Sequence, residues 1–242
     1  MFSGLPTVFG IKPSEVSATP KHQLGTKGIA SDGRVFRYAK NSSTEIATAS
    51  LCMMADCSSN HGDCVFQTAG VIGDKQAKIT IATTAVIANE YVGGYMVIND
   101  GTGQGYNHLI VGHTAGTGTV TFDIKPTLQL ATDTSTAVQL VRNPFYGVLI
   151  TDADLANTPL GVTPRVITAS YYFWLQTSGI CSCLLDATTK PTAGQPLTIG
   201  DVTAGAVEVI AAATEHVVGR ALVGSKIADT GDTAAIQLTL ES

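Results

Sequence analysis

Apolar and polar residues alternate with a period of two in many short segments of this chain. Residues 35–40 alternate after a turn at Asp32-Gly33, and residues 119–124 alternate again. Further short apolar segments follow at intervals of roughly 8–15 residues, separated by Gly, Pro, Asn and Asp. No segment holds an apolar stripe of helical period over three turns. The pattern therefore predicts an all-β fold, a sandwich or barrel of short antiparallel strands.

The first 30 residues lack a sustained period. Pro6, Pro13 and Pro20 interrupt them, and proline removes a backbone donor, so neither a helix nor a central strand is expected there. We expect residues 1–30 to form an extended arm that lies on a partner; a frayed terminus is the alternative. The apolar residues predicted to contact the partner are Leu5, Val8, Phe9 and Ile11.

Domain boundaries are weakly marked, because composition changes little along the chain. The segment "LANTPLGVTPRV" (155–166) contains two prolines and is the best candidate for a linker. We therefore expect a β domain over residues 31–155 and a C-terminal, barrel-like β domain over residues 165–242. Residues 42–58 are the place where a short helix could occur.

The stretch "VINDGTGQGYNHLIVGH" (97–113) resembles a phosphate-binding loop at first sight. Gly101, Gly103 and Gly105 have the wrong spacing for a dinucleotide loop, and β-branched residues follow in place of a helix. A glycine-rich hairpin turn explains the stretch better, because glycine adopts positive φ at little cost. The predicted strands are residues 95–99 and 106–111.

Two histidines in the same stretch could serve as ligands or bases. His108 and His113 are five residues apart, so on a regular strand they point to opposite faces. They could ligate one metal only if a bulge occurred at Gly112. We expect them to be polar strand positions beside the turn.

One segment has a pattern that could bind metal. Cys52, Cys57, His61 and Cys64 are soft or borderline ligands within "CMMADCSSNHGDC". Structural zinc sites use cysteine pairs separated by a longer loop, and these irregular gaps do not fit that rule well. The alternative is small buried thiols, and the same holds for the two cysteines of "CSC" (181–183), which are expected to be packing residues.

Composition narrows the class of function. Charged residues make up 14% of the chain and the net charge is −5, which argues against a nucleic-acid surface. Such sparse charge is typical of a surface covered by neighbouring copies. The five cysteines, without a secretory signal at the start of the sequence, are expected to be reduced thiols in a cytoplasm. No apolar run is long enough to span a bilayer, so no membrane partner is expected.

Catalytic signatures are weak. The chain has no Gly-x-Ser-x-Gly elbow, and an enzyme such as a depolymerase would depend on the isolated acids Asp152, Asp154 or Glu208. We expect neither enzymatic activity nor a cofactor. The aromatic segment "YYFWLQ" (171–176) predicts a strand with one core face and one interface face, which would place Tyr172 and Trp174 against a partner.

Three blocks together resemble the auxiliary head proteins of tailed bacteriophages, which decorate or cement the capsid. They are "LGTKGIASDGRVFRYAKN" (24–41), the strand-turn-strand block that begins "GGYMVINDGTGQGYNHLIVGH" (93–113), and the C-terminal segment that begins "GQPLTIGDVTAGAVEV" and includes "HVVGRALVG" (194–242). The likeness spans most of residues 24–242 and is carried by structural glycines and apolar alternation.

The resemblance implies a virion protein on the outer surface of the capsid, assembled in the host cytoplasm. Its implied partners are the major capsid protein and further copies of itself, in a trimer that locks neighbouring capsomers. A symmetric oligomer would bury apolar strand faces that a monomer exposes. The alternative is a phage fibre or receptor-binding subunit, for which the aromatic segment would be the contact.

Overall fold

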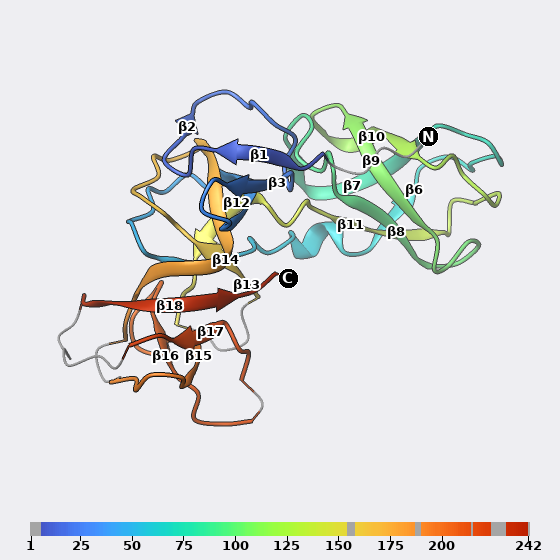
Figure 1. Ribbon diagram of the computed structural model, residues 1–242. Helices are drawn as coiled ribbons and strands as arrows, with labels where there is room; N and C mark the ends of the chain where they lie inside the picture. The colour runs from blue at the N-terminus through green and yellow to red at the C-terminus, as the bar shows by residue number, and fades with distance from the viewer. Residues whose placement is uncertain (1–5, 154–157, 187–189, 214, 224–230, 242) are drawn as a thin grey trace. The chain divides into compact units, whose positions relative to one another are not determined.

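The computed structural model describes residues 6–153, 158–186, 190–213, 215–223 and 231–241 (Figure 1). The fold is all-β, as the alternating pattern predicts. Within the described ranges, the one helical segment is a short 3-10 turn, η1 (Ser59–His61). The chain forms two compact units, one made of residues 1–55 and 144–242 and the other of residues 56–143. We call them the sheet unit and the barrel unit.

The sheet unit contains a twelve-stranded sheet, whose hydrogen-bonded order is β1-β3-β4-β12-β5-β13-β14-β18-β17-β15-β16, with β2 beside β14. The strands are β1 (Val8–Ile11), β2 (Val16–Ser17), β3 (Lys27–Ala30), β4 (Val35–Asn41), β5 (Leu51–Met53), β12 (Tyr146–Ile150), β13 (Pro159–Val162), β14 (Tyr172–Leu184), β15 (Pro196–Ile199), β16 (Val207–Val209), β17 (Gly219–Ala221) and β18 (Thr233–Thr239).

Strand β14 organises this unit, because its two halves pair with different strands. The first half pairs with β4, and the pairing closes a ring of β4, β12, β5, β13 and β14. Phe173 and Leu175 lie on the face of β14 that enters the core of this ring, together with Val148. The second half of β14 pairs with β18. At the junction Gly179 has φ +95°, a conformation that favours glycine.

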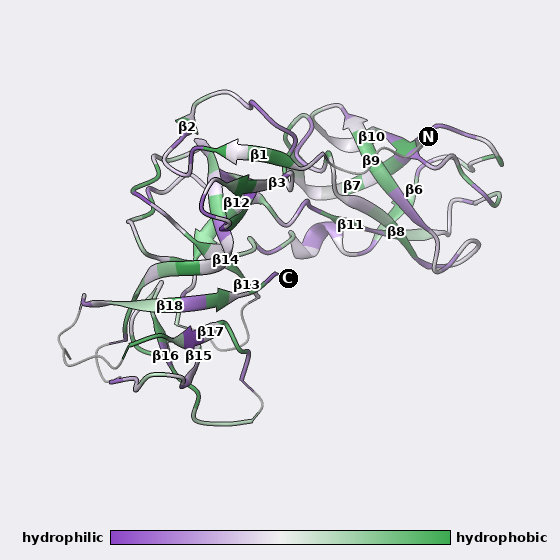
Figure 2. Ribbon diagram, viewed as in Figure 1, coloured by the Kyte–Doolittle hydropathy of each residue, from purple (hydrophilic) through white to green (hydrophobic). Residues whose placement is uncertain are grey.

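The second half of the sheet encloses a separate apolar core. Cys181 and Cys183 of β14 pack there with residues of β15, β16, β17 and β18, so the two cysteines of "CSC" are packing residues as predicted. A parallel bridge between Leu185 and Val207 joins the end of β14 to β16. Buried positions alternate with more exposed ones along β18, because only one face meets this core, and Figure 2 shows a hydrophilic position between hydrophobic ones in this strand.

The N-terminal segment is part of the sheet rather than a free arm. Strand β1 runs parallel to β3, and Ile11 is buried in a cluster with Trp174. This packing requires glycine at position 28, since a Cβ on Gly28 would lie 2.6 Å from the Trp174 ring. The expectation of an arm over residues 1–30 is therefore wrong for the described part, because Lys27–Ala30 is a paired inner strand.

The unit boundaries also differ from those expected. The linker predicted at residues 155–166 contains β13, which pairs with β5 and β14. Pro159 is the first residue of that strand, a position where its missing N–H is tolerated. The barrel unit is instead inserted between β5 and β12, which are antiparallel neighbours in the sheet. The helix considered for residues 42–58 is absent from these described residues, and β5 lies there.

The barrel unit is a closed barrel with the strand order β10-β7-β6-β11-β8-β9. Its interior is one continuous apolar core that includes Phe66, Met96 and Phe122. Closure leaves no strand edge within the barrel. The strands are β6 (Cys64–Phe66), β7 (Gln76–Val86), β8 (Tyr95–Asp100), β9 (Asn107–His113), β10 (Gly116–Lys125) and β11 (Ala137–Val141).

The glycine-rich stretch of the barrel forms the predicted hairpin. Strands β8 and β9 pair antiparallel, and Gly101, Gly103 and Gly105 between them all have positive φ, at +80°, +90° and +90°. At the start of β8, a Cβ on Gly94 would lie 2.1 Å from the Val141 carbonyl oxygen. Glycine is required there because the backbones of β8 and β11 approach closely.

Candidate functional site

Strand β1 presents the most exposed large apolar side chain of the sheet unit's described residues. Phe9 is 74% exposed, whereas Ile11 is 9% exposed and packs inward. Val8 is half-buried against the same cluster as Ile11. Leu5, the remaining residue predicted for the arm contact, lies outside the described residues. Because β1 is the first strand in the sheet order, its outer backbone groups face away from β3. We call β1 with Phe9 the edge surface.

Most of the aromatic segment is covered within the sheet unit. Trp174 is fully buried and packs against Tyr38, with ring centroids 5.0 Å apart, while Tyr172 is half-buried in the same cluster. The Trp174 Nε1–H donates to Glu15 Oε2 at 3.3 Å. The predicted partner-binding role of Trp174 is therefore wrong. Both faces of the first half of β14 are covered within the unit, one in the ring and the other under β1 and β3.

The four metal-ligand candidates of the cysteine segment do not come together. Cys52 lies in β5 of the sheet unit, where burial raises the pKa of its thiol and the thiol donates to the Ser50 carbonyl. Cys64 is buried in the barrel core, and the Cys57 sulfur accepts a hydrogen bond from the Arg142 N–H. All five cysteines are free thiols. In the described part of the chain, they belong to no cluster of three ligand atoms.

His61, the fourth candidate, has both ring nitrogens engaged inside the barrel. Nε2 lies 2.9 Å from the Thr84 carbonyl, which can only accept, so Nε2 carries the proton. Nδ1 lies 2.5 Å from the Tyr91 hydroxyl and accepts from it. Burial raises the pKa of Tyr91 to about 12, which keeps it a donor. The imidazole therefore has no nitrogen left to ligate a metal.

The two histidines of the glycine-rich stretch both point into the barrel, contrary to the prediction of opposite faces. His113 is 7% and His108 1% exposed. The register of β9 on β10 shifts between Ile110 and Gly112, and this bulge restores His113 to the inner face. They do not share a site, since His108 Nδ1 donates to the Pro126 carbonyl at 2.9 Å.

His113 is held as a neutral imidazole. Its Nδ1–H donates to the Thr114 carbonyl at 2.9 Å, and its Nε2 accepts from the Tyr91 N–H at 3.0 Å. Burial lowers the pKa of His113, although Thr114 and Glu90 act in the opposite direction. These are structural hydrogen bonds at one end of the barrel.

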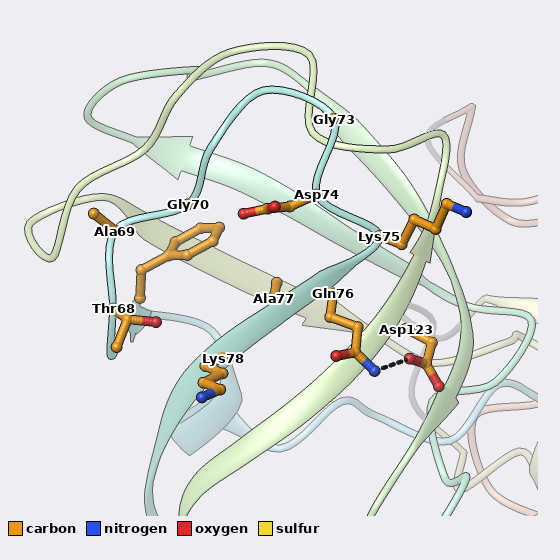
Figure 3. Close-up of a pocket in the computed structure, with 11 residues that line it drawn as sticks. Thr68, Ala69, Gly70, Gly73, Asp74, Lys75, Gln76, Ala77, Lys78 and Asp123 are labelled. Atoms are coloured by element: carbon orange, nitrogen blue, oxygen red, sulfur yellow. Dashed lines mark hydrogen bonds between the residues drawn. The ribbon is translucent and has the colours of Figure 1, made fainter.

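A cleft of about 640 Å³ opens on the barrel wall (Figure 3). Its two carboxylates both have structural partners. Asp74 accepts from the Val71 N–H at 2.7 Å, and Asp123 accepts from the Gln76 amide at 2.7 Å. Figure 3 shows the side chain of Lys75 directed away from Asp74. The cleft therefore brings no acid-base pair together.

Three carboxylates converge in the sheet unit. Asp186 follows β14, Asp201 follows β15, and Glu208 is the middle residue of β16. One oxygen of each lies within 4.8 Å of the other two. Burial, the charges of Asp201 and Asp186, and a hydrogen bond with Asp201 raise the pKa of Glu208 to about 7. We call these three residues the acidic cluster.

No local pattern in the sequence marks Asp186 and Asp201 as site residues. In the sequence, Glu208 is an isolated acid. Asp152 is absent from the cluster, and Asp154 lies outside the described residues. The parallel bridge between Leu185 and Val207 creates the cluster, and it joins segments that no local pattern connects.

Comparison with known proteins adds no relative. No protein-family model matches the chain, and no curated protein or solved structure matches it significantly. The described residues include no helix with the length and apolar character needed to span a bilayer.

Proposed function

We propose that this protein is a virion structural subunit that decorates a bacteriophage capsid. It binds the outer surface of the assembled shell as a homotrimer and bridges neighbouring capsomers. The protein acts by binding and carries out no reaction. The proposal joins the resemblance of three sequence blocks to the surface properties of the sheet unit.

The edge surface is the observation that carries the proposal. An edge strand offers unpaired N–H and C=O groups, and a neighbouring chain can extend the sheet there. Phe9 is 74% exposed on that strand, so an added strand would also bury a large aromatic side chain. Gly10 follows with φ +69°, which forms a bulge and leaves Phe9 outside while Ile11 turns inward.

The rest of the surface supports an assembly protein. Charged residues make up only 14% of the chain, and depletion of charge is typical of interface cores. Several aliphatic side chains are also exposed on the described surface of the sheet unit, at 45% or more. They are Val166, Ile180, Val202, Val217 and Val223.

Co-sedimentation with empty, expanded shells of the major capsid protein from the same genome tests the proposal. Wild-type protein is expected to pellet with the shells and to saturate them. Phe9→Ser is expected to weaken this binding about tenfold or more, because it removes a buried aromatic contact. Ile87→Ser is the matched control, since Ile87 is 66% exposed on the barrel unit. Failure of the wild-type chain to bind any such shell contradicts the proposal.

The oligomeric state is a second readout. The chain has a mass of 25.0 kDa, and light scattering is expected to give three times that value. A receptor-binding fibre subunit is the alternative, but the burial of Trp174 removes the aromatic contact that motivated it. Binding to host-cell glycans without any affinity for shells would favour this alternative.

A further inference from the structure

The acidic cluster places three carboxyl groups together in the described structure. In the described part of the chain, no ion pair with lysine or arginine includes Asp186, Asp201 or Glu208. Glu215 adds a further negative charge that acts on Glu208. Like charges at this spacing repel one another, and the repulsion is strongest where water is scarce. Asp186 is only 1% exposed, so solvent screens its carboxylate poorly.

The backbone around the cluster fixes Asp186 in place. Asp186 Oδ2 accepts from the N–H groups of Val202 and Thr203, at 2.9 Å and 3.1 Å. Gly200 leaves the room this carboxylate occupies, since a Cβ there would lie 2.6 Å from Oδ2. The loop between β15 and β16 is thus shaped around one carboxylate, and it carries the second, Asp201.

A separate observation in this region is a buried hydroxyl group on the same face as Glu208. Thr198 lies directly opposite Glu208 in the β15–β16 ladder. Its neighbours Leu197 and Ile199 enter the apolar core, so Thr198 shares the other face with Glu208. Thr198 is 1% exposed, and its hydroxyl has no hydrogen-bond partner in the described structure. A buried hydroxyl on this face can supply an oxygen ligand to a cation, or can bond to a water that the cation holds.

We infer that Asp186, Asp201 and Glu208, with the hydroxyl of Thr198, form a calcium-binding site. All the donors are oxygen atoms, which suit a hard cation. Three carboxylates with water molecules supply the six to eight ligands that Ca²⁺ takes, whereas Mg²⁺ is usually held by one or two carboxylates. The cation neutralises the repulsion and joins the end of β14 to the β15–β16 hairpin. The inference does not depend on the proposed function.

Calorimetric titration of the full chain with CaCl2 at about pH 8 is the test, together with thermal unfolding with Ca²⁺ or with a chelator. One Ca²⁺ is expected to bind per chain, with Kd in the range of about 10⁻⁵ to 10⁻³ M. When Ca²⁺ exceeds Kd by about a hundredfold, the unfolding temperature is expected to rise by roughly 5–10 °C. Mg²⁺ is expected to produce a smaller rise.

Variants locate the site. Asp201→Asn and Glu208→Gln are expected to fold, because each removes one of several like charges, and to lose both the binding heat and the rise. Glu45→Gln, which changes an exposed acid of the same unit, is expected to keep both. Thr198→Val is expected to weaken Ca²⁺ binding about tenfold. The inference is overturned if the wild-type chain binds no Ca²⁺ at about 5 mM, or if binding survives both Asp201→Asn and Glu208→Gln.

Discussion

The barrel unit and the sheet unit differ in how completely their strand edges are paired. The barrel closes six strands on themselves around one apolar core. Of its three buried histidines, His61 and His113 have both ring nitrogens hydrogen-bonded. The sheet unit also closes a ring, of β4, β12, β5, β13 and β14, but it leaves β1 at the end of its strand order, and it distributes its apolar residues among three clusters.

The difference matters for binding, because an open strand edge can pair with another chain and a closed barrel has no such edge. The features for which we propose a ligand or partner, the edge surface and the acidic cluster, both belong to the sheet unit. The described barrel instead offers a polar cleft whose carboxylates have structural partners. The barrel is an insertion that folds around its own core, while the sheet unit carries the proposed binding functions.

Core truncation tests whether the two units are separate in stability. Phe122→Ala in the barrel and Trp174→Ala in the sheet unit each remove a fully buried aromatic side chain. Each is expected to lower the free energy of unfolding by about 3–5 kcal/mol. Hydrogen exchange is expected to rise in the unit that carries the substitution and to stay unchanged in the other. Equal loss of protection in both units would show that they unfold as one.

Substitution of Glu241, near the C-terminal end of the sheet unit, is expected to have a smaller effect on the free energy of unfolding. Glu241 accepts hydrogen bonds from Arg37 and Thr177, and although burial raises its pKa, these bonds lower it below the ordinary value. Glu241→Gln is expected to cost about 1–2 kcal/mol, because a charge-assisted bond to a largely buried group is lost. Urea unfolding followed by tryptophan fluorescence measures this. Glu45→Gln, at an exposed acid, is the control and is expected to change the free energy of unfolding little.

A fall in pH is expected to lower the stability of the barrel unit selectively. Because burial lowers the pKa of folded His113, the unfolded chain binds a proton first as the pH falls. The stability is fully present above the unfolded value of about 6.5 and is lost as the pH falls from there through the folded pKa. Hydrogen exchange in β9 and β10 at about pH 7.5 and 5.5 checks this. In His113→Asn, which has no titrating ring, amide protection is expected to fall less between the two pH values than it does in the wild type. An identical fall in both proteins would contradict the account.

Phe9→Ser is expected to have the smallest effect on folding. The side chain is 74% exposed, so the free energy of unfolding is expected to change by less than about 0.5 kcal/mol. The same variant is expected to weaken shell binding about tenfold or more, which would separate a surface role from a structural one. A large drop in thermal stability would instead place Phe9 in the packing of the sheet unit.

Local patterns predicted the local structure well. The hairpin of β8 and β9 follows from glycines at positions where φ is positive, and the all-β class follows from the period of two. Pairings between distant segments could not be predicted. Leu149 pairs with Met53, so the ends of the inserted barrel meet in the sheet although 95 residues lie between them in sequence. No composition change marks that insertion.

The alternating pattern of the aromatic segment does not reveal that both of its faces are covered by the same chain. An alternating pattern cannot distinguish a core face from an interface face, and Trp174 is covered by its own chain through β1 and β3. The histidine prediction was wrong for a different reason, because one bulged residue reversed the face of His113. The acidic cluster depends on a single parallel bridge, which no period along the sequence reveals.

Electron microscopy of expanded capsid shells incubated with this protein tests the central claim most directly. The account predicts added density on the outer surface at three-fold or quasi-three-fold positions, with the edge surface of the sheet unit against the shell and the barrel unit free of the lattice. Bare shells in the presence of saturating protein, or density bound through the barrel alone, would contradict it.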